Sequence, residues 1–292
     1  MHASRNAVQR SAGLTLAVAA AALLLLSAMV YAQATPGANQ APVAVPRAAS
    51  SAPASAPATA QSADEALYQQ ITELRNLPRV PQGKQISDVP EVKQAIDDQL
   101  TKSLALTAEF LKKYPKNEYA DEVLVQRMDT VRLLAVVNDK PLDNFRAEAK
   151  KVLAGDASDK VKSTVAFMLV QTDLQDTFKA LKENEQLPED QKAEAWKKAV
   201  VKQAGDYIKK YPKSEFAKEF YGVLIETAVQ DRNFDRAYEL LDQLRANFPD
   251  EPAVPQIAQF IQQAAATQSA ATQPGPATQK ASPATRKAPA AE

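Results

Sequence analysis

The chain has 292 residues, of which 35 are Lys or Arg, 35 are Asp or Glu, one is His and none is Cys. The histidine is His2, so the rest of the chain lacks the imidazole and thiol groups of nucleophilic triads, thiol redox chemistry and most zinc or haem sites. Six of the basic residues and one acidic residue lie outside residues 64–264, which leaves 29 basic against 34 acidic side chains there. This acidic excess argues against a nucleic-acid-binding protein, which would need clustered cations.

The first 34 residues are typical of a secretory signal peptide. Arg5 and Arg10 precede the apolar run Leu14–Val30, and Ala32-Gln33-Ala34 fits the small-residue rule for cleavage. Cleavage after Ala34 is therefore predicted, with a site after Ala32 as an alternative. The chain is then expected in the periplasm or outside the cell, without an integral membrane domain. The alternative is an uncleaved signal that anchors the chain in the inner membrane, because its 17-residue run reaches the lower limit for a membrane span.

Residues 35–61 and 265–292 consist mainly of Ala, Pro, Ser, Thr and Gln. Such segments lack the apolar surface that offsets the loss of chain entropy on folding, and we expect a disordered linker and a disordered tail. The folded core is then predicted to be residues 62–264.

Helical periodicity runs through this core, and no segment alternates in the way a half-buried strand does. An all-α fold follows. The first helix is predicted to begin at Ser62, where Glu65 completes a capping-box pattern. The second is predicted to begin at Ser87 or Asp88, with Pro90 in its first turn, and to end at Tyr114-Pro115. Its expected apolar stripe consists of the following residues: Val92, Ile96, Leu100, Leu104, Ala108 and Leu111. Trp196 is expected to pack on a neighbouring helix.

An internal repeat is the most informative feature of the core. Residues 110–120 read FLKKYPKNEYA, and residues 207–217 read YIKKYPKSEFA. In each copy an aromatic residue and two lysines close a helix, Pro stops it, and Asn117 or Ser214 can cap the next helix. A weaker echo pairs Asn144-Phe145 with Asn233-Phe234. The repeat predicts a duplicated four-helix unit, with related halves at about 88–185 and 186–264.

Residues 221–249 resemble a tetratricopeptide repeat (TPR). The spacings of Tyr221, Leu224, Ala228, Ala237, Leu241 and Pro249 are similar to those of that family, whereas Ile225 stands where a Gly is usual. The resemblance implies antiparallel helix pairs stacked as a short TPR-like α-solenoid. The phrase KKYPKSEFA also resembles exported bacterial envelope proteins and the helical region that precedes thioredoxin-like domains in some exported redox proteins.

By the same resemblance, a groove for a partner would be lined by the first helix of each pair. In the best-matched repeat its exposed residues are expected to be Glu219, Glu226, Val229 and Gln230. A protein or peptide could dock there through complementary side chains.

No catalytic residue, metal ligand or cofactor site is predicted, since the core has no His or Cys and its four glycines are too far apart for a phosphate-binding loop. The hypothesis favoured by these observations is an exported, non-catalytic interaction scaffold of the bacterial cell envelope. One alternative is an accessory helical module that works with a thioredoxin-like redox protein. Another is a carboxylate-dependent cell-wall hydrolase. The identity of the partner and the oligomeric state are left open.

Overall fold

A computed structural model describes residues 62–272 of the chain, so the predicted signal peptide, the linker 35–61 and most of the tail lie outside the described residues. The described part contains nine α-helices, one short 3₁₀ helix and no strand, which confirms the all-α prediction. The elements are α2 (Ala63–Glu73), η1 (Ile86–Asp88), α3 (Pro90–Lys113), α4 (Ala120–Val137), α5 (Asp143–Ala154), α6 (Asp159–Glu183), α7 (Glu189–Lys210), α8 (Ala217–Gln230), α9 (Phe234–Asn247) and α10 (Val254–Thr272).

The contacts within the chain divide it into two compact units, with the boundary between Ala217 and Lys218. The predicted boundary between related halves, at 185/186, falls instead in the connection between α6 and α7, inside the first unit. A TPR-like solenoid remains a prediction. We describe the two units separately.

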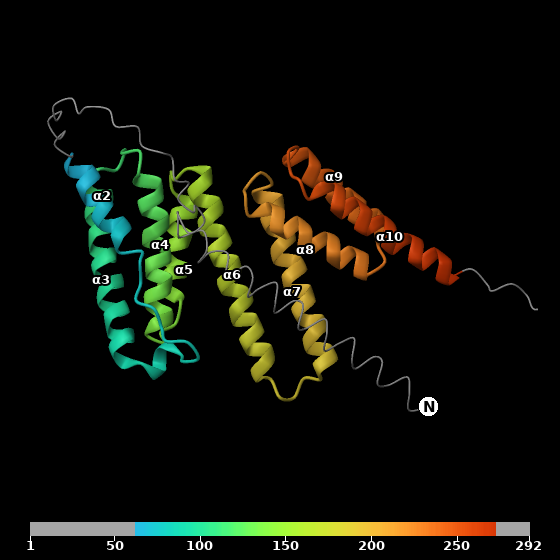
Figure 1. The fold of residues 1–292 in the computed structure, drawn as a ribbon, viewed down its shortest axis with the longest axis horizontal. Helices are drawn as coiled ribbons and strands as arrows, with labels where there is room; N and C mark the ends of the chain where they lie inside the picture. The colour runs from blue at the N-terminus through green and yellow to red at the C-terminus, as the bar shows by residue number, and fades with distance from the viewer. Residues whose placement is uncertain (1–61, 273–292) are drawn as a thin grey trace, which may run out of the picture. The chain divides into compact units, whose positions relative to one another are not determined.

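In the first unit, helices α2 to α7 lie side by side (Figure 1). Helix α3 packs against α2 and α4, and α4 also contacts α5 and α6, while α7 packs on α6. Three apolar clusters hold these helices together. They are centred on Phe145 and Val165, on Ile71 and Phe110, and on Ile96 and Leu100.

The second helix ends where the sequence predicts, but it begins at Pro90 with Val89 at its N-cap, because Ser87 and Asp88 belong to the short helix η1. Its buried face also differs from the expected stripe. Leu104 is only partly buried and Ala108 is exposed, whereas Ser103 and Thr107 are buried. The Thr107 hydroxyl donates to the Ser103 backbone oxygen at 2.9 Å, which satisfies its polar group inside the helix. The stripe was misplaced because small hydroxyl residues were counted as polar.

Two expected caps also differ in the structure. Ser62 is the N-cap of α2, but its side chain makes no capping hydrogen bond. Ser214 bonds the Tyr207 hydroxyl at 2.9 Å instead of capping α8, whereas Asn117 accepts from the Tyr119 backbone N–H at 2.9 Å just before α4. Side-chain capping therefore contributes less to the starts of these helices than the sequence pattern suggests.

The repeated phrase forms the same turn in both copies. The residues after α3 and α7, Tyr114 and Tyr211, have φ, ψ angles of −130°, 54° and −130°, 57°. The backbone N–H groups of Asn117 and Ser214 then donate to the carbonyls of Tyr114 and Tyr211, at 3.1 Å in both cases. Pro follows the tyrosine in each copy and prevents the helix from continuing.

The aromatic residues around the two turns are arranged alike. Tyr119 stacks on Tyr68 with ring centroids 4.0 Å apart, and the equivalent Phe216 stacks on Phe167 at 4.2 Å. In both copies the aromatic residue one turn before the tyrosine, Phe110 or Tyr207, also contacts the stacked ring of the neighbouring helix. The repeat therefore extends to a helix that packs beside each turn, α2 in one copy and α6 in the other.

The weaker echo is not structurally equivalent. Phe145 is the third residue of α5 and is completely buried, whereas Phe234 is the first residue of α9 and is half-buried. The shared Asn-Phe pair thus starts two helices in different registers.

In the second unit, α9 packs on α10 and buries Leu240, Leu241 and Leu244. The turn after α9 repeats the pattern once more, since the Phe248 N–H donates to the Leu244 carbonyl at 2.8 Å and Pro249 follows. Helix α10 runs to Thr272, although the core was predicted to end at 264. Its last turns include the run Ala264-Ala265-Ala266, and Ala has the highest helix propensity of all residues.

Candidate functional site

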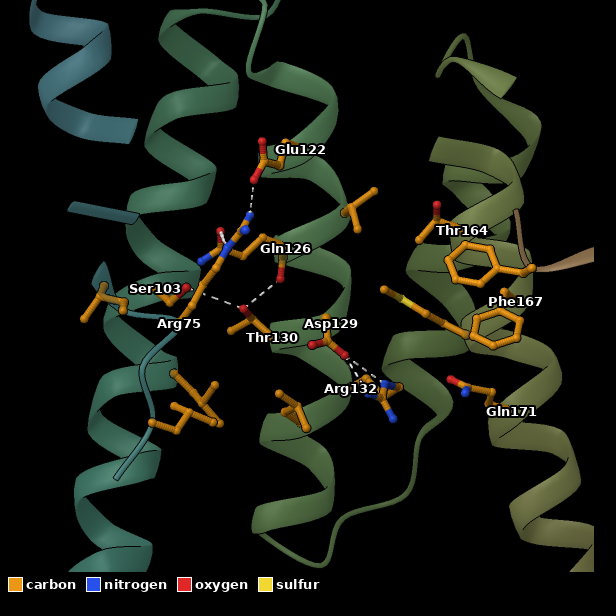
Figure 2. A pocket seen from close by; sticks show the side chains of 17 residues that line it. Arg75, Ser103, Glu122, Gln126, Asp129, Thr130, Arg132, Thr164, Phe167 and Gln171 are labelled. Atoms are coloured by element: carbon orange, nitrogen blue, oxygen red, sulfur yellow. Dashed lines mark hydrogen bonds and ion pairs between the residues drawn. The ribbon is translucent and has the colours of Figure 1, made fainter. Parts of the chain in front are cut away.

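A cavity of about 290 Å³ in the first unit is the best candidate for a binding site. Its floor is α4, one wall is formed by the end of α2 together with α3, and the other wall is α6 with Phe216 (Figure 2). The apolar residues that line it are Leu74, Leu77, Leu100, Val125, Leu133, Phe167, Met168 and Phe216. Ligand pockets in proteins combine such a lining with a few polar groups.

The phenyl rings of Phe167 and Phe216 form a rigid part of the α6 wall. Their stacking places both rings nearly parallel, with an interplanar angle of 11°. Phe167 is 2% exposed. Because Phe216 belongs to the second copy of the repeated turn, this turn directly shapes the cavity.

The charged residues of the cavity are paired with one another. Arg75, just beyond the end of α2, contacts Glu122 of α4 at 2.8 Å and donates to the side-chain oxygen of Gln126 at 2.7 Å. Glu122 also accepts from the Tyr68 hydroxyl at 2.7 Å. Burial raises the pKa of Tyr68, and this bond raises it further. The network therefore ties α2 to α4.

A second pair lies along α4. Arg132 contacts Asp129 at 2.6 Å, and the Arg132 side chain is only 12% exposed (Figure 2). With both carboxylates of the cavity paired to guanidinium groups, the lining carries no net formal charge.

Gln171 is the polar group of the cavity that lacks a partner. It belongs to α6, is 7% exposed, and extends its amide from α6 toward α4 (Figure 2). Within the described residues this amide has no hydrogen bond, whereas the buried Gln126 amide donates to the Ile71 carbonyl at 2.9 Å. The Gln171 amide is not among the fully buried unpaired side-chain atoms, so it is open to the cavity and is available to a ligand or to water.

The residues predicted to line a groove on α8 are distributed differently. Glu226 and Gln230 are exposed and share a hydrogen bond of 3.1 Å, and Glu219 is half-buried. Val229 is only 9% exposed, so the expectation that it is exposed was wrong. The sequence predicts one narrow packed stripe, but the buried residues of α8 form a single face that covers about half of the helix circumference and includes Val229. They are Phe220, Tyr221, Leu224, Ile225, Ala228 and Val229. Docking of a partner on Glu219, Glu226 and Gln230 stays a prediction.

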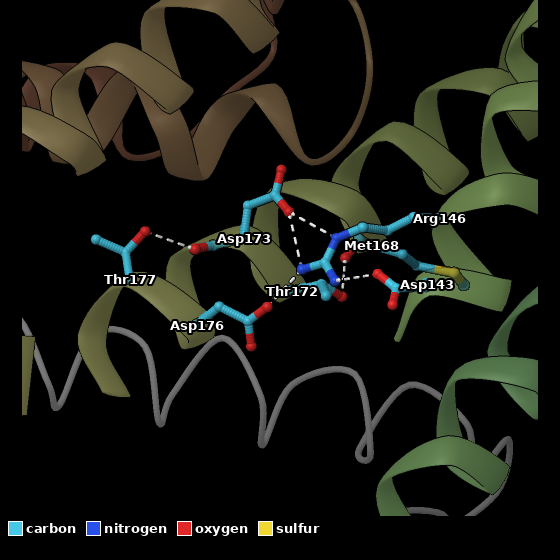
Figure 3. A network of polar contacts seen from close by, with 7 residues as sticks. All are labelled: Asp143, Arg146, Met168, Thr172, Asp173, Asp176 and Thr177. Carbon is cyan, nitrogen blue, oxygen red and sulfur yellow. Dashed lines mark hydrogen bonds and ion pairs between the residues drawn. The ribbon is translucent and has the colours of Figure 1, made fainter. Parts of the chain in front are cut away.

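An ionic cluster joins α5 to α6. Arg146 reaches Asp173 at 3.2 Å and Asp176 at 2.5 Å, and Asp143 lies 4.0 Å away (Figure 3). The hydrogen bond that Arg146 donates to Asp176 is the main cause that raises the pKa of Arg146 above its usual value. Because one guanidinium already occupies the carboxylates, we assign the cluster a role in holding the two helices together.

A second, more open hollow of about 800 Å³ lies beside the Tyr211-Pro212 turn. Lys160, Lys210 and Lys213 surround it and are exposed, and the Lys210 ammonium lies 5.3 Å from the centre of the Tyr211 ring. Lys210 lies in the last turn of α7, where a cation suits the helix dipole, and Lys160 and Lys213 are ordinary exposed lysines. We therefore assign this hollow no ligand.

Trp196 packs as predicted. It is 3% exposed and meets the ring of Phe178 of α6 edge to face, with centroids 5.4 Å apart. Its indole N–H has no hydrogen-bond partner within the part of the chain that the structure describes.

Sequence reasoning missed the cavity because it weighed exposed residues of α8 and overlooked buried polar residues of α4 and α6. A signal was present in the sequence. Gln171 follows Phe167 by four residues and Gln126 follows Val123 by three, so both glutamines fall in register with apolar core positions. A polar side chain at such a position either forms a hydrogen bond within the protein, as Gln126 does, or faces a cavity.

Among residues 62–272, no group of three or more acidic, His or Cys side chains is arranged to hold a metal ion. No helix in that range is both long and apolar enough to cross a membrane. Comparison of the chain with protein-family models, with curated protein sequences and with solved structures gave no match.

Proposed function

We propose that this chain is an exported, non-catalytic scaffold of the bacterial cell envelope, which binds a segment of a partner protein in the cavity between α3, α4 and α6. The single observation that carries the proposal is the Gln171 amide, which faces a largely apolar cavity without a hydrogen-bond partner among the described residues. A bound peptide would satisfy it.

The surrounding chemistry supports binding more than turnover. Glu122 and Asp129 are the acidic residues of the lining, and each is held by an arginine. A carboxylate pair for glycoside hydrolysis needs one group that gives up a proton and one that is free to attack or to activate water. Glu122 instead ties the α2 end of the chain to α4, and Asp129 is held by Arg132 within α4.

The export part of the proposal is supported by the sequence. Residues 1–34 have the pattern of a signal peptide, and a chain without cysteine has no thiol that an oxidising compartment could cross-link.

Photo-crosslinking in cells would test the proposal. A photoreactive residue is placed at Thr164, on the cavity wall, and in a matched variant at Lys198, on α7 outside the cavity. We expect a reproducible protein adduct from position 164 alone, and we expect Gln171→Leu to reduce it. Equal adducts from both positions, or none from position 164, would overturn the proposal. An adduct to a thioredoxin-like protein would favour the alternative in which this chain is an accessory module of a redox protein.

A further inference from the structure

The cavity favours an uncharged occupant. Arg75 neutralises Glu122, and Arg132 neutralises Asp129, so a charged group that entered would lose its hydration without gaining a free counter-ion. This excludes most nucleotides, acidic peptides and basic peptides as good ligands.

The polar and apolar groups of the cavity together fit an extended peptide. The Gln171 amide offers a donor and an acceptor, which complement the carbonyl and the N–H of a peptide group. Around it, Leu133, Met168 and Phe167 provide contacts for an aliphatic side chain. The volume of about 290 Å³ is at the lower limit for small-molecule sites, so only one or two side chains fit.

The chain itself contains a segment with these properties. Residues 35–61 carry one charge, on Arg47, and their only aliphatic side chains larger than alanine are Val43 and Val45. Both valines lie in Ala41–Pro46, which reads APVAVP. Residues 273–292 contain no aliphatic side chain larger than alanine, so the tail is a poorer candidate.

The position at which this segment joins the fold lets it reach the cavity. It enters at Ser62, before α2, and the residues just beyond the other end of α2, Leu74 and Arg75, line the cavity. That helix has 11 residues and spans about 17 Å at 1.5 Å per residue. The chain from Pro46 to Ser62 can extend to about 55 Å. A tether of this length keeps the segment near the cavity at roughly millimolar effective concentration.

We infer that the cavity is a binding site for an uncharged extended peptide with a small aliphatic side chain, and that residues Ala41–Pro46 of the same chain occupy it. Gln171 hydrogen-bonds the peptide backbone, and Val43 or Val45 enters the apolar lining. A partner protein must then displace this segment. The inference goes beyond the proposed function, because a scaffold could bind its partner whether or not its own linker competes.

Disulfide trapping tests the inference, since the natural chain has no cysteine to interfere. Thr164→Cys supplies one thiol in the cavity of the full chain. The second thiol is supplied in turn by Ala38→Cys, Val45→Cys or Ala54→Cys. Ala38 and Ala54 lie on either side of the proposed segment. Their variants measure the rate of disulfide formation that tethering alone produces. We expect the Val45 pair to form an intramolecular disulfide about tenfold faster than either control.

Gln171→Leu in the Val45 pair should reduce the rate toward that of the controls while circular dichroism keeps the helical signal. A rate that changes smoothly from position 38 to position 54 would show tethering alone and would overturn the inference. Disulfide-linked dimers would assign the cavity to a second copy and would overturn it as well. Failure of this inference can be distinguished from failure of the proposed function. Photo-crosslinking of a partner from position 164 can still succeed in a variant that lacks residues 41–46.

Discussion

Tyr207 shows how one buried hydroxyl couples stability to pH. It is 3% exposed, donates to the Ser163 carbonyl at 3.0 Å, and lies 2.9 Å from the Ser214 hydroxyl. Burial raises its pKa to about 12 from the usual 10, so the folded chain favours the neutral phenol. The stability that this preference contributes is complete below pH 10 and is lost as the pH rises toward 12.

Tyr207→Phe removes this titration. We expect wild-type stability to fall by roughly 2 kcal/mol more than that of Tyr207→Phe between pH 9 and pH 12, measured by urea unfolding. At neutral pH the variant should lose about 1 kcal/mol with its hydrogen bond. Parallel curves for wild type and Tyr207→Phe would contradict the prediction.

Arg146 supplies the second residue-scale prediction, because its removal leaves Asp143, Asp173 and Asp176 facing one another without a cation. We expect Arg146→Met to lower the free energy of unfolding by about 1 kcal/mol at low ionic strength. The loss should be smaller in 1 M salt, since salt screens the repulsion among the three carboxylates. Methionine keeps much of the apolar stem, so the comparison isolates the charge.

Urea unfolding at the two salt concentrations is the measurement. Asp143→Asn is the matched control, because that carboxylate is 87% exposed and lies 4.0 Å from the guanidinium, and no measurable change is expected. A loss for Arg146→Met that is the same at both salt concentrations would assign the effect to packing instead of charge.

At the scale of elements, the two KKYP turns offer an internal comparison. Pro115 and Pro212 each follow a tyrosine with nearly identical backbone angles, and both lie in the first unit. Pro115→Ala and Pro212→Ala should each lower the free energy of unfolding by about 0.5–1 kcal/mol, mainly because the unfolded chain gains conformational entropy.

Equal costs in urea unfolding are expected because the backbone is the same in both turns. Lys116→Ala, one residue further along the first turn, is a control that should change stability little. If one proline variant lost several times more than the other, the two turns would not be energetically equivalent.

The elements also show what could be predicted from the sequence. Helix α3 and both repeated turns were predicted because Pro90, Pro115 and Pro212 act locally, through a fixed φ angle and a missing N–H. The stripe of α3 was wrong at Ala108, which is exposed, and it missed Ser103 and Thr107, whose burial depends on a neighbouring helix. Leu104 packs on the core as predicted. Such tertiary contacts have no local signature.

The cavity could be predicted only in part. The position of Gln171 in register with Phe167 marks it as buried, but the helices that enclose it come from residues 74 to 216. Only the packing of α4 on α6 brings them together. The unit boundary between Ala217 and Lys218 likewise follows from contacts and not from any break in the composition of the sequence.

At the scale of the whole molecule, the export hypothesis makes a direct prediction about the ends of the chain. If the signal is cleaved after Ala34, the exported protein begins at Thr35, and intact-mass measurement of the secreted chain should show the loss of 34 residues. Ala34→Phe should block or redirect cleavage, because signal peptidase sites need small residues. Recovery of the uncleaved chain in the membrane fraction would favour the anchored alternative.

Trp196 has a practical consequence for the whole molecule. It is the only tryptophan of the chain, and it lies in the first unit against Phe178. Its fluorescence therefore comes from that unit alone, whereas helical circular dichroism arises from both units. The chain thus carries a natural spectroscopic reporter that allows unfolding of the unit that contains the cavity to be followed without any label.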